Sequence, residues 1–299
     1  MRFSVCQHEP LNKIYPYGVA NGGIGFFTDH SILRTIISES EPDYCIAPFV
    51  IYINYLEDAD YLRWCDEIIR EHCQGLFELQ PEKYIFFHAG DNEYWPEVCR
   101  QSIWFNASAC GDNGVPLFQP IRLPTLNTSD IQDVPYDLSF QGTFVTHPIR
   151  KRIPSIMARC QKEGLHCCWQ ETSDFYRKVP EHWKLRNSYL RLMQNSKFVL
   201  CPRGWGHNSI RFFETIALGR IPVLISDRLR LPLEDMIEYN RFVVRVPEGD
   251  VRRTGEYIRE FLGAHDLGES SLLAQHVHRE YFADTQRFLG FHGILRKNF

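Results

Sequence analysis

The sequence predicts an α/β fold built from Rossmann-like βαβ units. Two apolar runs, Lys197–Cys201 and Ile221–Ile225, are typical of buried strands. Between them, apolar residues recur at helical spacing over Ile210–Ala217, and Gly219 then ends the helix. The chain has 299 residues and is 44% hydrophobic, which is enough for two domains of ordinary size, each with its own core.

The loop inside this βαβ unit is the predicted ligand site. Pro202, Gly204 and Gly206 indicate a tight loop after the first strand. Asn208 or Ser209 can cap the helix that follows. Loop and helix N-terminus therefore lie at the carboxyl end of a strand, where open α/β sheets bind their ligands.

Polar residues around this loop favour a nucleotide diphosphate. The N-terminus of a helix offers N–H groups and partial positive charge, and Arg203 flanks the loop. Arg211 in the first turn can fork onto phosphate oxygens. Glu214, three residues further on, suits the two hydroxyls of a ribose. The alternative is a surface Arg–Glu pair on an ordinary Rossmann helix.

The segment from Tyr189 to Glu248 resembles the nucleotide-sugar-binding signature of exostosin-like glycosyltransferases. It contains Pro-x-Gly, then Ser-x-Arg-x-x-Glu, then Gly-x-Ile-Pro-Val-x-x-Ser-Asp, then Leu-Pro and an acidic-aromatic segment. The resemblance implies a GT-B fold, in which two Rossmann-like domains face each other across a cleft. It also implies transfer of a sugar from a nucleotide donor, usually UDP-linked, with Ser209, Arg211 and Glu214 binding that donor.

The N-terminal half, residues 1–134, is predicted to be a Rossmann-like domain that binds the acceptor. Its helices are expected at Phe26–Ser38 and Glu57–Cys73. Its strands are expected at Arg2–Cys6, Tyr44–Tyr52, Tyr84–His88 and Ser102–Asn106.

The end of the Tyr84–His88 strand is the best position in this half for a general base. His88 and Asp91 stand at the carboxyl end of the strand, where an imidazole or carboxylate could deprotonate an acceptor hydroxyl. We favour Asp91, with His88 second. The alternative is a capped turn, since Asp and Asn are common turn residues. The family resemblance does not identify the base.

The C-terminal half, residues 135–299, is predicted to be the nucleotide-sugar-binding domain. A strand and glycine turn at Asp137–Val145 precede a helix that reaches about Glu163. The cations at 150–152 lie in its first turn, where their interaction with the helix dipole is unfavourable. A bound diphosphate would offset this unfavourable interaction. In similar enzymes an arginine after this strand reaches the donor phosphates, which points to Arg150 or Arg152. The alternative is a solvated basic face.

The rest of this half continues the α/β alternation. The final helix could cross back to the first domain, as in many GT-B enzymes. The expected elements are a strand at Leu165–Gln170, a helix at Glu181–Asn195, a strand at Phe242–Val246 and helices at Val251–Leu262 and Ser270–Phe288.

Composition limits the partners and the compartment. The net charge of −4 argues against a nucleic-acid or general polyanion binder. No apolar run approaches the ~18–20 residues that span a bilayer, so we expect a soluble cytoplasmic enzyme, or a trimmed form of a Golgi-type one. Cysteines in apolar patterns indicate reduced core thiols. Asp58 and Asp60 spell Asp-x-Asp, but they fit a helix N-terminus better than a metal site.

These observations predict a glycosyltransferase that moves a sugar from a UDP-sugar to a hydroxyl of a glycan acceptor. The family resemblance implies inversion at the anomeric carbon, and we expect independence from metals and cofactors. The alternative is a non-catalytic nucleotide- or sugar-binding module on the same fold. A dinucleotide oxidoreductase fits less well, because Ser209 stands where the third glycine of Gly-x-Gly-x-x-Gly would be.

Overall fold

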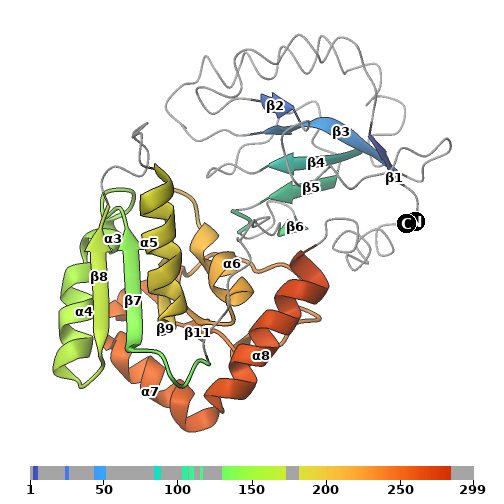
Figure 1. Ribbon diagram of the computed structural model, residues 1–299. Helices are drawn as coiled ribbons and strands as arrows, with labels where there is room; N and C mark the ends of the chain where they lie inside the picture. Colours follow the sequence, from blue (N-terminus) through green and yellow to red (C-terminus); the bar gives the residue numbers. More distant parts are fainter. Residues whose placement is uncertain are drawn as a thin grey trace. The chain divides into compact units, whose positions relative to one another are not determined.

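Figure 1 shows a computed structural model of the protein. The described residues are 3–5, 24–26, 44–51, 84–88, 103–106, 108–110, 115–116, 130–172 and 182–283. The chain divides into two compact units. The first comprises Met1–Pro120, Arg228–Leu233 and Asp284–Phe299, and the second comprises Ile121–Asp227 and Glu234–Ala283. The domain boundary at residues 134 and 135 stays a prediction.

The first unit contains a mostly parallel sheet. Its strand order is β1-β3-β4-β5-β6, and β2 pairs with β3 in antiparallel fashion. The strands are β1 Phe3–Val5, β2 Ile24–Phe26, β3 Tyr44–Ile51, β4 Tyr84–His88, β5 Ile103–Asn106 and β6 Val115–Pro116. The register between β3 and β4 shifts between Ile46 and Val50, the segment that contains Pro48, which has no N–H to pair. Phe26 belongs to β2 and not to the start of a helix.

The second unit contains a parallel sheet in the order β11-β10-β9-β7-β8. The strands are β7 Tyr136–Gly142, β8 Cys167–Glu171, β9 Ser196–Pro202, β10 Ile221–Ile225 and β11 Val244–Arg245. Every residue of β10 is buried, as is nearly every residue of β9, because helices cover both faces of a parallel sheet. The predicted α/β fold is therefore confirmed, while the facing of the two halves across a cleft stays a prediction.

Helices cover both faces of the second sheet (Figure 1). They are α3 Pro148–Lys151, α4 Ile153–Lys162, α5 His182–Gln194, α6 Ile210–Ala217, α7 Thr254–Ala264 and α8 Leu267–Val277. Helices α4 and α7 contact each other on one face, and α5 and α6 pack over the central strands on the other. Shorter helices are η5 Tyr239–Arg241, η6 Glu248–Arg253 and η7 His278–Phe282.

The core of the second unit contains interlocking aromatic rings on both faces of the sheet. Phe198 of β9 meets Phe261 of α7 edge to face, and Phe213 of α6 meets Phe282 of η7 in the same way. The thiol of Cys201 is also buried, and burial raises its pKa to about 12. Helix α8 packs on α6 and β10, so it belongs to this unit; residues beyond Ala283 lie outside the described part.

The predicted helix from His147 to about Glu163 is wrong in one respect, because the structure divides it. Helix α3 ends at Lys151 and α4 begins at Ile153. Pro154 lacks the N–H that would bond the carbonyl of Arg150 in the preceding turn, and its ring crowds that carbonyl, so the hydrogen-bond ladder is interrupted here. Arg150 therefore lies in a separate short helix, which His147 begins as N-cap by accepting a 3.3 Å hydrogen bond from the N–H of Ile149.

Candidate functional site

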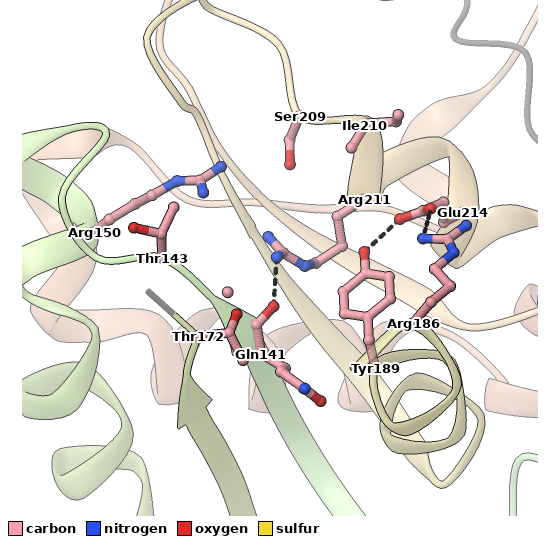
Figure 2. Close-up of a pocket in the computed structure, with 11 residues that line it drawn as sticks. Gln141, Thr143, Arg150, Thr172, Arg186, Tyr189, Ser209, Ile210, Arg211 and Glu214 are labelled. Carbon is pink, nitrogen blue, oxygen red and sulfur yellow. Dashed lines mark hydrogen bonds and ion pairs between the residues drawn. The ribbon is translucent and has the colours of Figure 1, made fainter. Parts of the chain in front are cut away.

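A pocket lies at the point where the strand order of the second sheet reverses. From β7 the chain crosses outward to β8, and from β9 it crosses the other way to β10, so the carboxyl ends of β7 and β9 flank the gap between two diverging connections. The described wall of the pocket comes from the end of β7, the residue after β8, and helices α3, α5 and α6 with the N-cap of α6 (Figure 2). Ligand binding is expected at such a switch point.

Arg211 holds a buried positive charge in this pocket. Its residue is 6% exposed, and its guanidinium carbon lies 4.3 Å from the ring centre of Phe140. Nη2 donates a 2.6 Å hydrogen bond to the carbonyl of Gln141. Nε is buried and has no hydrogen-bond partner among the described residues. Buried donors normally have a hydrogen-bond partner, so an unpartnered one on a pocket wall suggests that a bound ligand supplies the acceptor.

Gly142 allows Arg211 to take this place. A Cβ built on Gly142 would lie 2.6 Å from Nη2 of Arg211, much closer than real Cβ atoms approach a nitrogen. The strand therefore leaves room for the guanidinium directly against its backbone.

Ser209 supplies a second unsatisfied donor at the start of α6. It is the N-cap, with extended backbone at φ −139° and ψ 115°, yet its side chain makes no capping hydrogen bond. Ser209 is 4% exposed, and its Oγ has no partner within the described chain. Because the first turn of a helix also presents unbonded N–H groups, the hydroxyl and the helix N-terminus together offer donors of the kind that bind anions.

Glu214 lines the same pocket from the next turn of α6. Its side chain is 2% exposed and is engaged by two residues of α5 (Figure 2). Oε2 accepts a hydrogen bond from the hydroxyl of Tyr189, and Oε1 lies 2.5 Å from Nη1 of Arg186. Burial raises the pKa of the Tyr189 hydroxyl well above its usual value, so it remains a donor.

Arg150 fastens helix α3 to the end of β9 at the edge of the pocket. It is 9% exposed, with Nε donating to the carbonyl of Arg203 at 2.8 Å and Nη2 to that of Pro202 at 3.1 Å. Its charge thus lies on the pocket wall, where the sequence placed a phosphate-binding arginine. Arg152, the other candidate, caps α4 and is not among the pocket residues.

The remaining predicted donor residues shape the loop after β9. Arg203 donates to the carbonyls of Gly206 and Trp205, each at 3.2 Å. The N–H of Gly204 bonds the carbonyl of Asn208 at 3.4 Å. None of Arg203, Gly204 and Asn208 is among the described residues lining the pocket, so their donor-binding role stays a prediction.

The predicted base is not tested by this geometry. His88 is the last residue of β4, as expected, and only its backbone is described. Asp91 lies outside the described residues. The general base therefore stays a prediction.

Sequence reasoning missed the pocket residues contributed by α5. Arg186 and Tyr189 contact Glu214 across 28 and 25 positions of the chain, a relation that no local motif encodes. One signal was present: residues three apart on a helix share a face, and this face carries an arginine and a tyrosine within a predicted Rossmann unit.

In the described parts of the chain, no helix is both long and apolar enough to cross a bilayer. Within the same residues, no group of three or more His, Cys, Asp or Glu side chains is arranged to hold a metal ion.

Comparison with known proteins identifies the family. Residues 114–261 match the family model described as the exostosin GT47 domain. A probable glucuronoxylan glucuronosyltransferase of Arabidopsis thaliana is 38% identical over 79 residues, which are 26% of this chain and 17% of that protein. Exostosin-1 of Drosophila melanogaster is 26% identical over 198 residues, covering 55% of this chain and 26% of the relative.

The chain spans only a small part of these relatives. The first matches cover between 15% and 26% of the relatives' own lengths. Among solved structures, an alpha1,3-fucosyltransferase crystal structure aligns with a TM-score of 0.41 at 14% identity, over 100% of this chain and 91% of that one.

Proposed function

The chain belongs to the exostosin-like glycosyltransferase family, and from this premise we propose that it transfers a sugar from a nucleotide-sugar donor to a hydroxyl of a glycan acceptor. The donor diphosphate would rest on the N-terminus of α6, between Ser209 and Arg211. Glu214 would accept hydrogen bonds from the ribose, and the cation of Arg150 would add to the positive potential of the wall.

One observation carries the proposal. The three residues of Ser-x-Arg-x-x-Glu, together with Arg150 from a distant helix, line one pocket at the switch point of the second sheet. The buried Oγ of Ser209 and Nε of Arg211 both lack partners among the described residues. Two unsatisfied donors at a helix N-terminus match the chemistry of a phosphate group better than that of a neutral ligand.

The proposed chemistry depends on charge that develops on the leaving group. As the glycosidic bond to the nucleotide breaks, negative charge grows on the terminal phosphate. Donors already fixed by the fold stabilise that charge without reorganising, and here they are the N–H groups of α6, the Ser209 hydroxyl and the Arg211 guanidinium.

We extend the proposal to a UDP-linked donor, inversion at the anomeric carbon and independence from metal. The fixed cations of Arg211 and Arg150 support the last point, since they supply positive charge next to the phosphates; activity that survives EDTA would agree with it. A base at the end of β4, Asp91 or His88, would activate the acceptor hydroxyl. Relatives named as glucuronosyltransferases make a glucuronosyl donor the first to assay.

The test of the proposal is the effect of Arg211→Ala on UDP binding and sugar transfer. We expect kcat/KM to fall by roughly 10²–10³, equivalent to ~3–4 kcal/mol, because a fixed donor to the leaving group is lost. Calorimetry should show weaker UDP binding as well. Arg252→Ala, at an exposed arginine outside the pocket, is the matched control and should change neither quantity.

The outcomes separate the proposal from its alternative. Unchanged UDP binding in Arg211→Ala would overturn the assignment of the site. Binding of UDP and UDP-sugars without transfer to any acceptor, and without slow hydrolysis of the donor, would favour a non-catalytic nucleotide-sugar-binding module.

A further inference from the structure

Helix α5 places two residues against the carboxylate of Glu214, and neither belongs to the Ser-x-Arg-x-x-Glu motif. Arg186 and Tyr189 are three residues apart, so both project from one face of α5 toward α6. As Figure 2 shows, each binds a different carboxylate oxygen: Arg186 binds Oε1 and Tyr189 binds Oε2. The arrangement joins a partly exposed cation and a buried phenol to one buried acid.

Two donors on two oxygens fix the orientation of the carboxylate plane. Rotation of the Glu214 side chain would break at least one of the contacts, and a buried carboxylate that loses its partners is strongly disfavoured. Each oxygen can still accept a second hydrogen bond. Glu214 therefore presents two acceptors with a fixed spacing on the pocket wall.

Two arginines lie close to the ring of Tyr189. The guanidinium carbons of Arg186 and Arg211 lie 5.3 Å and 5.5 Å from the centre of its ring. The same ring thus contacts the arginine that we assign to the phosphates and the arginine that binds Glu214. Tyr189 links the two polar ends of the pocket in one packed unit.

We propose that Arg186 and Tyr189 are positioning residues, which orient Glu214 toward the 2′- and 3′-hydroxyls of the nucleotide ribose. This inference rests on the proposed function, because it needs a nucleotide in the pocket. Two acceptors fixed side by side match two hydroxyls on adjacent carbons, each of which can donate one hydrogen bond to a carboxylate oxygen.

A merely structural role for the trio predicts something different. If Arg186 and Tyr189 only tie α5 to α6, their loss should weaken binding of every ligand of the pocket by the same factor. If they orient Glu214, their loss should affect only ligands that carry the ribose hydroxyls. The ratio of affinities for UDP and 2′,3′-dideoxy-UDP separates the two cases.

The experiment measures both dissociation constants by calorimetry with the full chain. Wild-type protein should bind UDP roughly 10–100-fold more tightly than 2′,3′-dideoxy-UDP, as expected for hydrogen bonds to a charged acceptor. Tyr189→Phe and Arg186→Gln should each weaken UDP binding by about 5–20-fold. Both should leave the affinity for the dideoxy nucleotide nearly unchanged, so that the ratio falls. Arg186→Lys keeps a cation at this position, so its ratio of the two affinities should lie between those of Arg186→Gln and the wild type.

Tyr257→Phe is the matched control, because it also removes a tyrosine–carboxylate hydrogen bond. The Tyr257 hydroxyl donates to Asp250 Oδ2 at 3.0 Å, away from the pocket. This variant should keep the wild-type ratio. Circular dichroism and Tm identify variants that fail to fold. If Tyr189→Phe fails, the partly exposed Arg186→Gln decides the question.

Two results would overturn the inference in distinguishable ways. An unchanged ratio in both variants, or a wild-type protein that binds the two nucleotides equally, would reject the positioning role and leave the proposed function intact. A wild-type protein that binds neither nucleotide would reject the proposed function, and the positioning role with it.

Discussion

Arg211 shows how a single residue can be both buried and ready to bind. One face of its guanidinium packs on Phe140, and one nitrogen is held by the carbonyl of Gln141. These contacts replace part of the water that a charged group loses on burial. Its Nε is also buried and has no partner among the described residues, which leaves this donor available to the ligand that we propose.

Gly142→Ala should impair the pocket while leaving the fold intact. The added Cβ would come 2.6 Å from Nη2 of Arg211, and the flexible side chain would have to move. Gly142 does not adopt a left-handed backbone conformation, so alanine itself fits the strand. We expect UDP affinity to fall by roughly 10–100-fold, as for a displaced charge-assisted hydrogen bond, with little change in Tm. Calorimetry measures the UDP affinity, and thermal denaturation measures the Tm.

Gly263→Ala is the matched control for this prediction. A Cβ at Gly263, inside α7, would meet nothing within 4 Å. Its UDP affinity should equal that of the wild type, and its stability should rise by up to about 1 kcal/mol. Unchanged UDP binding in Gly142→Ala would show that Arg211 does not need its present place.

At the residue scale, the sequence predicts the parts of the pocket that follow one another along the chain. Ser209, Arg211 and Glu214 are separated by helical spacing, so a local pattern suffices to group them. Gln141 and Arg186 reach the pocket only through strand order and helix packing. Without knowing that β7 lies beside β9, no spacing argument places them there.

Helix ends carry the next level of organisation. Gly164, after α4, has φ +94°, and Gly219, after α6, has φ +64°. In the first case the N–H of Leu165 closes back on the carbonyl of Cys160 at 3.0 Å. Left-handed residues of this kind satisfy the last carbonyls of a helix and turn the chain into the next strand.

Gly164→Ala and Gly219→Ala should separate backbone strain from packing. A Cβ at Gly164 meets nothing within 4 Å, so its cost is the left-handed conformation alone, about 1 kcal/mol. For a unit of this size that lowers Tm by roughly 2–4 °C. A Cβ at Gly219 would also overlap the side chain of Gln275 on α8, so its Tm should fall further. Equal decreases of Tm in the two variants, measured by thermal denaturation, would contradict this account.

The elements themselves were predictable where the local signals agree. Strands β4 and β10 have the predicted bounds, since each is a mainly apolar run that begins directly after a charged residue, Lys83 or Arg220. The predicted bounds are wrong where tertiary contacts determine whether an element forms or where it ends. The break between α3 and α4 depends on Pro154, whose effect a periodic pattern hides, and strand β2 exists by pairing with β3.

Stability of the whole molecule should depend on pH through His278. Burial lowers the pKa of His278 to about 4 from 6.5. Below pH 6.5 the unfolded chain therefore binds a proton that the folded chain does not accept until about pH 4. The stability contributed by the neutral, partly buried ring is complete above pH 6.5 and is lost as the pH falls toward 4.

His278→Gln should remove this part of the acid sensitivity. Urea unfolding at pH 7.5 and 4.5 gives the loss of unfolding free energy for each protein. We expect a loss smaller by about 2 kcal/mol in the variant than in the wild type. His276→Gln, at an exposed histidine two residues earlier, is the control and should behave as the wild type does. Equal losses in all three proteins would refute the role of His278.

The switch-point pocket also has an evolutionary consequence. All of its described wall residues come from one unit, between Gln141 and Glu214. Substitutions can therefore accumulate in the rest of the chain without changing these side chains. If the pocket binds the donor as proposed, substitutions in the rest of the chain could change the acceptor while the preference for the activated sugar is inherited unchanged.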